Sequence, residues 1–95
     1  MSDHQTAPMA CQSVRFFLDA DAEPGLLPRL LLPFAKRDLT PDRMWAHRTA
    51  ALMHVEIALS AMPAHEIALV EGNLRQIVGV RRVNRVLPEQ EARAA

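Results

Sequence analysis

The hydrophobic period of the chain changes on either side of residues 19–25, and this change constrains the fold more than any other feature. Before the segment, apolar side chains recur at every second position, which is typical of a strand with one buried face; they are Val14, Phe16 and Leu18. After it they recur at spacings of three and four, which is typical of a helix; they are Leu27, Leu30, Leu31 and Phe34. We therefore predict a strand over residues 13–19 and a helix over residues 25–37.

The segment between them, Asp-Ala-Asp-Ala-Glu-Pro-Gly, has the composition of a strand-to-helix turn. Acidic residues suit a helix N-terminus, Pro24 fits the first helical turn, and Gly25 lets another group approach the backbone closely. Such a turn presents several backbone N–H groups without helical partners, and these groups favour a carboxylate or a phosphate. The simpler alternative is that the segment only caps the helix.

Pro33 lies inside the predicted helix. Proline removes a backbone hydrogen bond and crowds the preceding turn, so we expect a kink or an early stop near Leu32. Asp38 and Pro41 follow the helix and should end it, with Asp38 able to adopt a left-handed conformation.

Residues 44–59 form a predicted hairpin, and the apolar patterns of its two strands can be compared as a test of the register. With Ala50 and Ala51 at the centre of the turn, His47 pairs with His54 and Trp45 pairs with Glu56. This register places the apolar side chains of both strands on one face, whereas a slip of one residue would mix the faces. The turn lacks the usual Asn-Gly or Asp-Gly sequence.

The rest of the chain adds one helix and one strand. Pro63 opens a helix whose apolar stripe is Ile67, Val70, Leu74 and Ile77. A last strand over residues 79–87 has valines three residues apart, which predicts a bulge. The resulting order, β-α-β-β-α-β, predicts a ferredoxin-like α+β sandwich in which two helices cover one face of a four-stranded antiparallel sheet.

Length and composition limit the domain count and the class of protein. We expect one domain over residues 13–88, a loose tail over residues 1–12 and a frayed end over residues 89–95. Eleven basic and eleven acidic side chains cancel, which argues against a nucleic-acid binder. A single cysteine excludes an intrachain disulfide, and no segment resembles a signal peptide or a membrane helix. We therefore expect a cytoplasmic protein with no membrane partner.

The chain resembles ACT domains, and most closely the small regulatory subunit of acetolactate synthase. The resemblance runs from about Val14 to Leu87 and rests on the run Glu-Pro-Gly-Leu-Leu-Pro-Arg-Leu at residues 23–30, on Phe34 and Arg37, on the hairpin region 42–60, and on Ile-Val-Gly-Val-Arg-Arg-Val at residues 77–83. It implies a dimer that binds a small amino acid, such as a branched-chain one, and regulates a larger catalytic subunit of branched-chain amino acid biosynthesis.

By position, the resemblance implies a ligand site bordered by Ala22, Glu23, Gly25, Leu26 and, at the start of the second strand, Thr40. In the small subunits an asparagine stands at the positions of Ala22 and Thr40. The alternative is therefore an interaction and dimerisation domain that binds no ligand. We expect no cofactor, and no acid–base pair or nucleophile has the spacing of a catalytic site, so we expect no enzyme activity.

Three other groups of side chains remain. His47 and His54 should lie directly across from each other with Glu56 nearby, so a metal-binding module is the less favoured alternative. Phe17 and Trp45 should point away from the helices as a partner-contact patch. Three arginines of the last strand should form a solvated edge or contact an acidic partner; they are Arg81, Arg82 and Arg85.

Overall fold

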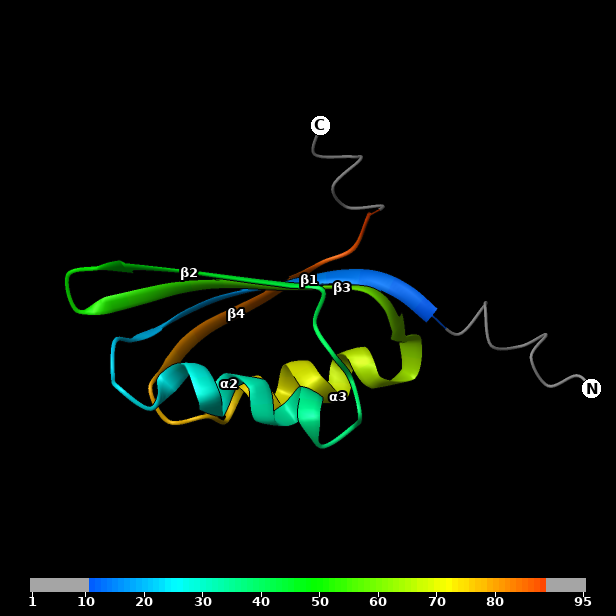
Figure 1. Ribbon diagram of the computed structural model, residues 1–95, viewed down its shortest axis with the longest axis horizontal. Coiled ribbons are helices and arrows are strands. Elements are labelled where there is room, and N and C mark those ends of the chain that lie inside the picture. The colour runs from blue at the N-terminus through cyan, green and yellow to red at the C-terminus, as the bar shows by residue number, and fades with distance from the viewer. Residues whose placement is uncertain (1–10, 89–95) are drawn as a thin grey trace, which may run out of the picture.

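The computed structural model describes residues 11–88, so residues 1–10 of the tail expected over residues 1–12, and the frayed end over residues 89–95, lie outside the described part. Six elements follow one another along the chain (Figure 1). They are β1 (Cys11–Asp21), α2 (Leu26–Ala35), β2 (Arg43–Thr49), β3 (Leu52–Pro63), α3 (Ala64–Arg75) and β4 (Val80–Val86). The first strand thus begins at Cys11, two residues earlier than the apolar alternation predicts.

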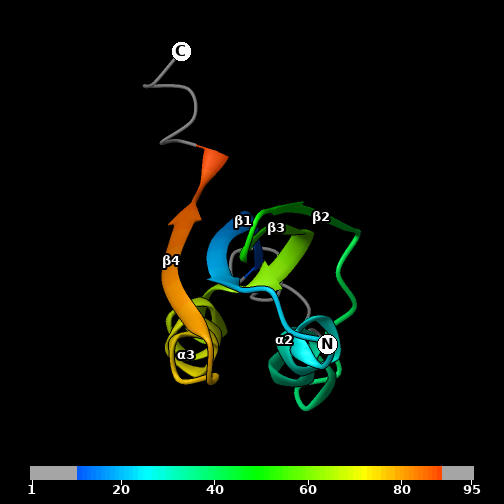
Figure 2. The ribbon, with the colours of Figure 1, turned by 90° about the vertical axis from the view of Figure 1, so that its left-hand side faces the viewer.

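The four strands form one antiparallel sheet in the order β2-β3-β1-β4. Figure 2 shows α2 and α3 side by side on the same face of this sheet, while no helix of residues 11–88 lies on the opposite face. This two-layer arrangement is the predicted ferredoxin-like fold. It confirms the order of elements and the placement of both helices.

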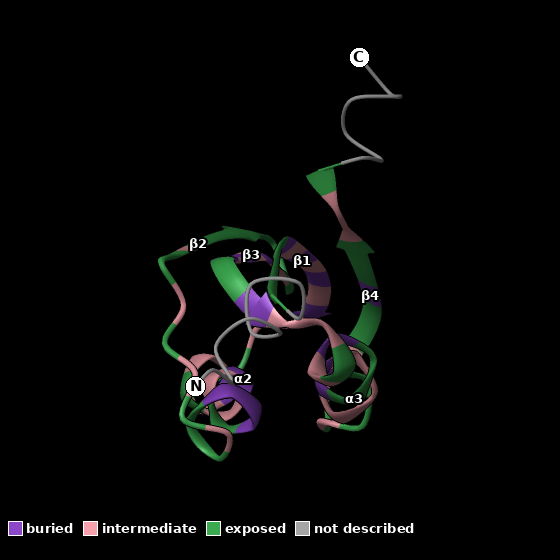
Figure 3. Cartoon of the chain, turned by 90° about the vertical axis from the view of Figure 1, so that its right-hand side faces the viewer, coloured by how far each residue is buried: buried purple, intermediate pink, exposed green. Residues whose placement is uncertain are grey.

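The hydrophobic core lies between the sheet and the two helices (Figure 3). Every second residue of β1 is buried from Val14 to Ala20, as the period-2 pattern requires. Phe16 on β1 and Phe34 on α2 are both fully buried, and their rings meet edge to face with centroids 5.8 Å apart. Burying an aromatic pair of this kind stabilises the domain by more than its area alone, by about 0.5–1.5 kcal/mol.

The β2–β3 hairpin has the predicted register. His47 pairs with His54, Trp45 with Glu56, and Thr49 with Leu52, so Ala50 and Ala51 form the turn. Ala50 adopts a positive φ of 56°, the left-handed conformation that glycine or asparagine would normally occupy in such a turn.

The early stop expected near Leu32 is wrong, because α2 continues through Pro33 to Ala35. Pro33 cannot donate to the carbonyl of Arg29, but it is buried, and its neighbours Leu30 and Phe34 are also buried in the core. Packing of this apolar face outweighs the lost hydrogen bond. After the helix, Asp38 takes the left-handed conformation that an aspartate is able to adopt, with φ 58°.

The predicted bulge in the last strand is present. Asp19 pairs with Arg82 and Ala20 pairs with Val80, so Arg81 is an extra residue opposite β1. Val83 is buried, whereas Val80 is only half-buried. The spacing of three between the valines is therefore accommodated by the change of register.

Candidate functional site

The turn between β1 and α2 is held from both sides by loops that are distant in sequence. The N–H of Asp21 donates to the carbonyl of Gly79 at 2.8 Å, and the N–H of Ala22 donates to the carbonyl of Ala51 at 2.9 Å. The α3–β4 loop and the tip of the hairpin therefore flank the turn at one end of the molecule (Figure 1). These two bonds fix the start of α2 relative to the sheet.

The same bonds reduce the number of donors that the turn offers to a ligand. The N–H of Ala22 donates to the carbonyl of Ala51, and the N–H of Leu26 donates to the carbonyl of Glu23 at 3.1 Å. Pro24 has no N–H group. Within residues 22–26, this leaves the N–H groups of Glu23 and Gly25 for an anion. The turn is thus a smaller anion site than the sequence alone predicts.

A cavity of about 410 Å³ opens beside the turn, and we call it the notch. Its lining consists of Ala22, Glu23, Pro24, Leu27, Pro28, Arg48 and Met53. Glu23 and Arg48 supply one acidic and one basic group, while the other five side chains are apolar. A volume of this size is within the range of sites for small molecules.

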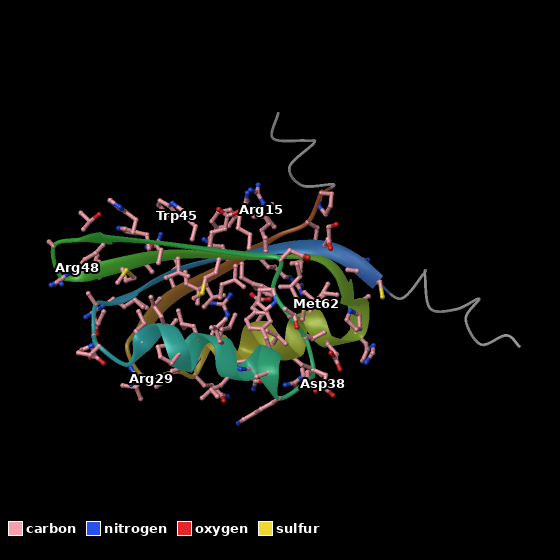
Figure 4. The ribbon with its side chains drawn as sticks, in the orientation of Figure 1. Arg15, Arg29, Asp38, Trp45, Arg48 and Met62 are labelled. Atoms are coloured by element: carbon pink, nitrogen blue, oxygen red, sulfur yellow. The ribbon has the colours of Figure 1, made fainter. Side chains whose placement is uncertain are left out.

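Arg48 is a site residue that the sequence analysis misses. It stands near the end of β2, and its Nε donates to the carbonyl of Ala50 at 2.9 Å, which holds its side chain at the hairpin tip. Figure 4 shows Arg48 at the same end of the molecule as Arg29 of α2. The predicted hairpin register places Arg48 opposite Met53, and these two residues line the notch together.

The residues implied by the family resemblance lie in different places. Ala22 and Glu23 line the notch, whereas Leu26 is buried in the core, 1% exposed. Gly25 lies under the guanidinium of Arg29, since a Cβ at this position would meet Nη1 of Arg29 at 3.0 Å. Thr40 is exposed in the connection from α2 to β2, beyond the opposite end of α2 from the turn. One chain alone therefore does not bring Thr40 to the notch.

Glu23 has a partner within the chain. Its Oε1 lies 3.2 Å from Nη2 of Arg29, and the two side chains are 47% and 40% exposed. A pair this exposed contributes little to stability, about 0–1 kcal/mol. A cationic ligand group can therefore replace Arg29 at small cost.

The two histidines meet as predicted, and each has a further contact. His47 lies directly across from His54, stacks on Trp45 with ring centroids 5.7 Å apart, and His54 Nδ1 lies 2.7 Å from Asp19 Oδ1. Glu56 contacts Arg43 at 2.8 Å and Arg15 at 3.1 Å. Within residues 11–88, no three acidic, histidine or cysteine side chains are grouped to hold a metal ion.

The aromatic patch lies on the open face of the sheet, as predicted. Figure 4 shows Trp45 on the side of the sheet opposite the helices, and this side chain is 53% exposed. Phe17 is only half-buried, and the guanidinium of Arg15 lies 5.2 Å from its ring centre.

The three arginines of β4 pair within the chain, with Asp21 at 2.6 Å, Asp19 at 4.0 Å and Glu71 at 3.3 Å.

Comparison with protein families identifies the domain. Residues 6–92 match the model of the ACT-like domain family. The chain belongs to the ACT-like domain family. ACT-like domains are typically regulatory and ligand-binding rather than catalytic, which agrees with the expected absence of enzyme activity in this part of the protein.

Solved structures show the same ACT fold. The chain is similar to the crystal structure of the ACT domain from GTP pyrophosphokinase of Chlorobium tepidum, with a TM-score of 0.69 and 12% identity over 80% of this chain and 99% of that one. The solution structure of the same domain gives a TM-score of 0.68 and 13% identity over 82% and 89% of the two chains. Comparison with curated proteins finds no match.

In residues 11–88 no helix is long and apolar enough to span a membrane.

Proposed function

We propose that the chain is a non-catalytic regulatory module that binds a small amino acid in the notch. The observation that carries this proposal is the lining of the notch, which combines one carboxylate, one guanidinium and five apolar side chains. A free amino acid carries one ammonium and one carboxylate beside its side chain, so the charges of ligand and site are complementary.

Each part of an amino acid has a matching group in the notch. The ligand ammonium pairs with the Glu23 carboxylate, and the ligand carboxylate pairs with Arg48 and with the N–H group of Glu23. Leu27 and Met53 offer an apolar wall to the ligand side chain, which favours a branched-chain amino acid over a polar one.

A second copy of the chain completes the site in this proposal. β2 is an edge strand whose residues are exposed except Met44, and its free backbone groups suit pairing with another sheet edge. An edge-to-edge homodimer is the arrangement in which Thr40 of one copy approaches the notch of the other. By resemblance, the regulated partner is a larger catalytic subunit such as that of acetolactate synthase.

A domain that supports its partner without binding a ligand is the second candidate function. Two observations favour it: Ala22 carries no polar side chain where the small subunits have an asparagine, and Glu23 is already paired with Arg29. The metal-binding alternative has no such support, since His54 pairs with Asp19 and His47 stacks on Trp45.

Isothermal titration calorimetry separates the two candidates. Valine, leucine, isoleucine and the other amino acids are titrated into the full chain, together with isovalerate and isobutylamine, which each lack one charged group. We expect heat from at least one apolar amino acid and about tenfold weaker binding of both analogues. If no amino acid gives heat, the chain is an interaction domain without an effector.

A further inference from the structure

A second cavity of about 410 Å³ lies on the helix layer, and we call it the helix groove. Four of its lining residues form one stripe along α2 at spacings of three and four: Arg29, Leu32, Pro33 and Lys36. The remaining four come from the end of α3 and the loop that follows it: Asn73, Gln76, Ile77 and Val78. The helix groove is therefore the furrow between two neighbouring helices.

The helix groove exposes two large apolar side chains. Val78 is 77% exposed and Leu32 is 51% exposed, while Ile77 and Pro33 between them pack toward the core. Exposed apolar side chains that gather at one furrow mark a contact surface more often than isolated ones do.

The charges at the rim of the helix groove have a single sign. Arg29 and Lys36 are basic, none of the eight lining residues is acidic, and Asn73 and Gln76 add amide groups. Asn73 already accepts a hydrogen bond through Oδ1 from Arg37 at 3.1 Å, which leaves its NH₂ group to donate. The rim therefore favours carboxylates.

We propose that the helix groove docks an acidic amphipathic helix of the protein that the module regulates. A helix is favoured because a third helix seats its apolar ridge in the furrow between two others. Arg29 and Lys36 are seven residues apart, so their Cα atoms lie roughly 10 Å apart along α2. A partner helix that lies along α2 matches them with two carboxylates seven residues apart and with apolar side chains between them.

Arg29 belongs to both sites, and this gives the docked partner a means to sense the notch. Its guanidinium pairs with Glu23 of the notch, and its side chain lines the helix groove. A ligand ammonium that takes over Glu23 frees Arg29 for the carboxylate of the docked helix. Binding at the two sites then has a favourable coupling free energy, which acts equally in both directions.

Photo-crosslinking identifies the occupant in the cells that naturally make the chain. Val78 is replaced by p-benzoyl-phenylalanine in the full chain, and Leu69, which is 53% exposed on α3 outside the helix groove, is replaced in the control. We expect position 78, and not position 69, to link to a segment with acidic residues on both sides of an apolar stripe. A link to a second copy of this chain, to a neutral or basic segment, or to nothing overturns the proposal.

The linked segment is then made as a synthetic peptide and titrated into variants of the full chain. Lys36→Glu and Val78→Glu should each weaken binding about tenfold or more, whereas Leu69→Glu should change it by less than about twofold. Equal losses in all three variants overturn the proposal. Circular dichroism melting confirms that each variant is folded.

This proposal rests on the regulatory role proposed above, but the two fail separately. Peptide binding is measured first without any amino acid, and calorimetry of the notch is measured without the peptide. Peptide binding without heat from amino acids leaves the helix groove as the partner site of a ligand-free domain. Heat from amino acids without peptide binding overturns only the docking site.

Discussion

The carboxylate of Glu23 and the guanidinium of Arg29 lie 3.2 Å apart and form an ion pair between the notch and the helix groove. Both side chains are close to half exposed, so the pair contributes at most about 1 kcal/mol to folding. A pair this weak can exchange partners when a ligand or another protein arrives. Substitutions at these two residues should therefore change binding far more than stability.

Glu23→Gln tests the acidic side of the notch. We expect the affinity for an amino acid to fall about tenfold or more, because the ligand ammonium loses its counter-charge. The midpoint of thermal unfolding should move little. Asp38→Asn is the matched control, since it removes an exposed carboxylate at a left-handed position that asparagine also tolerates. Equal losses in both variants would exclude Glu23 from the site.

Arg48→Ala tests the basic side. Calorimetry should show that this variant binds the amino acid about tenfold more weakly. Arg82→Ala should bind it as the parent chain does, which would show that the loss does not come from a change in overall surface charge. Arg82 is a suitable comparison because its side chain is 72% exposed and lies on the edge strand β4, away from the notch. Should Arg48→Ala bind as the parent chain does, the ligand carboxylate is held elsewhere.

Ala50→Gly should stabilise the domain. Ala50 has φ 56°, a conformation that costs a residue with a side chain about 1–2 kcal/mol and glycine almost nothing. After the greater entropy of glycine in the unfolded chain is subtracted, a gain of roughly 0.5–1 kcal/mol remains. Urea unfolding measures it. Ala51→Gly, at the neighbouring turn residue without a positive φ, should instead destabilise the domain.

Phe34→Ala should remove a large share of the stability. Phe34 is fully buried against Phe16, and truncation of such a side chain costs about 3–5 kcal/mol out of a typical total of about 5–15 kcal/mol. Leu32→Ala, two residues earlier on the exposed side of α2, should cost about 0.5 kcal/mol or less. Equal free energies of unfolding for the two variants would contradict this assignment of the core.

Asp42 gives the domain a dependence on acid pH. Hydrogen bonds from Ser60, first from its backbone N–H, hold the pKa of the Asp42 carboxyl below its ordinary value of 3.8. A carboxyl with a lowered pKa in the folded state adds stability above the unfolded value, and this stability is lost as the pH falls through the folded value. The advantage of the parent chain over Asp42→Asn in urea should thus shrink below about pH 4. A constant difference from pH 7 to pH 3 would contradict the assignment.

The local patterns predicted most of the fold. The apolar alternation of β1 and the matching faces of β2 and β3 fixed which sides are buried, because a shift of one residue would expose all of them. Whether the helix stops near Pro33 could not be judged in the same way. Its outcome depends on how firmly Leu30 and Phe34 pack against the sheet, which is a property of the whole fold.

The candidate site was less accessible to sequence reasoning. Glu23 and Ala22 are next to each other in the chain, but Arg48 reaches the notch only because the hairpin tip bonds to the turn through Ala51. The predicted register already paired Arg48 with Met53. The length of the hairpin was therefore the one sequence signal that could have placed Arg48 beside the strand-to-helix turn. The helix groove depends on the spacing of two helices, which no local pattern gives.

The hydrogen bond from Asp21 to Gly79 has a mechanical consequence. Gly79 follows Val78 directly, so one peptide unit separates the wall of the helix groove from the root of the strand-to-helix turn. The root and the neighbouring loop are therefore joined by main-chain groups alone. This connection needs no charged side chain, so we expect it to remain when the charged residues around it are replaced.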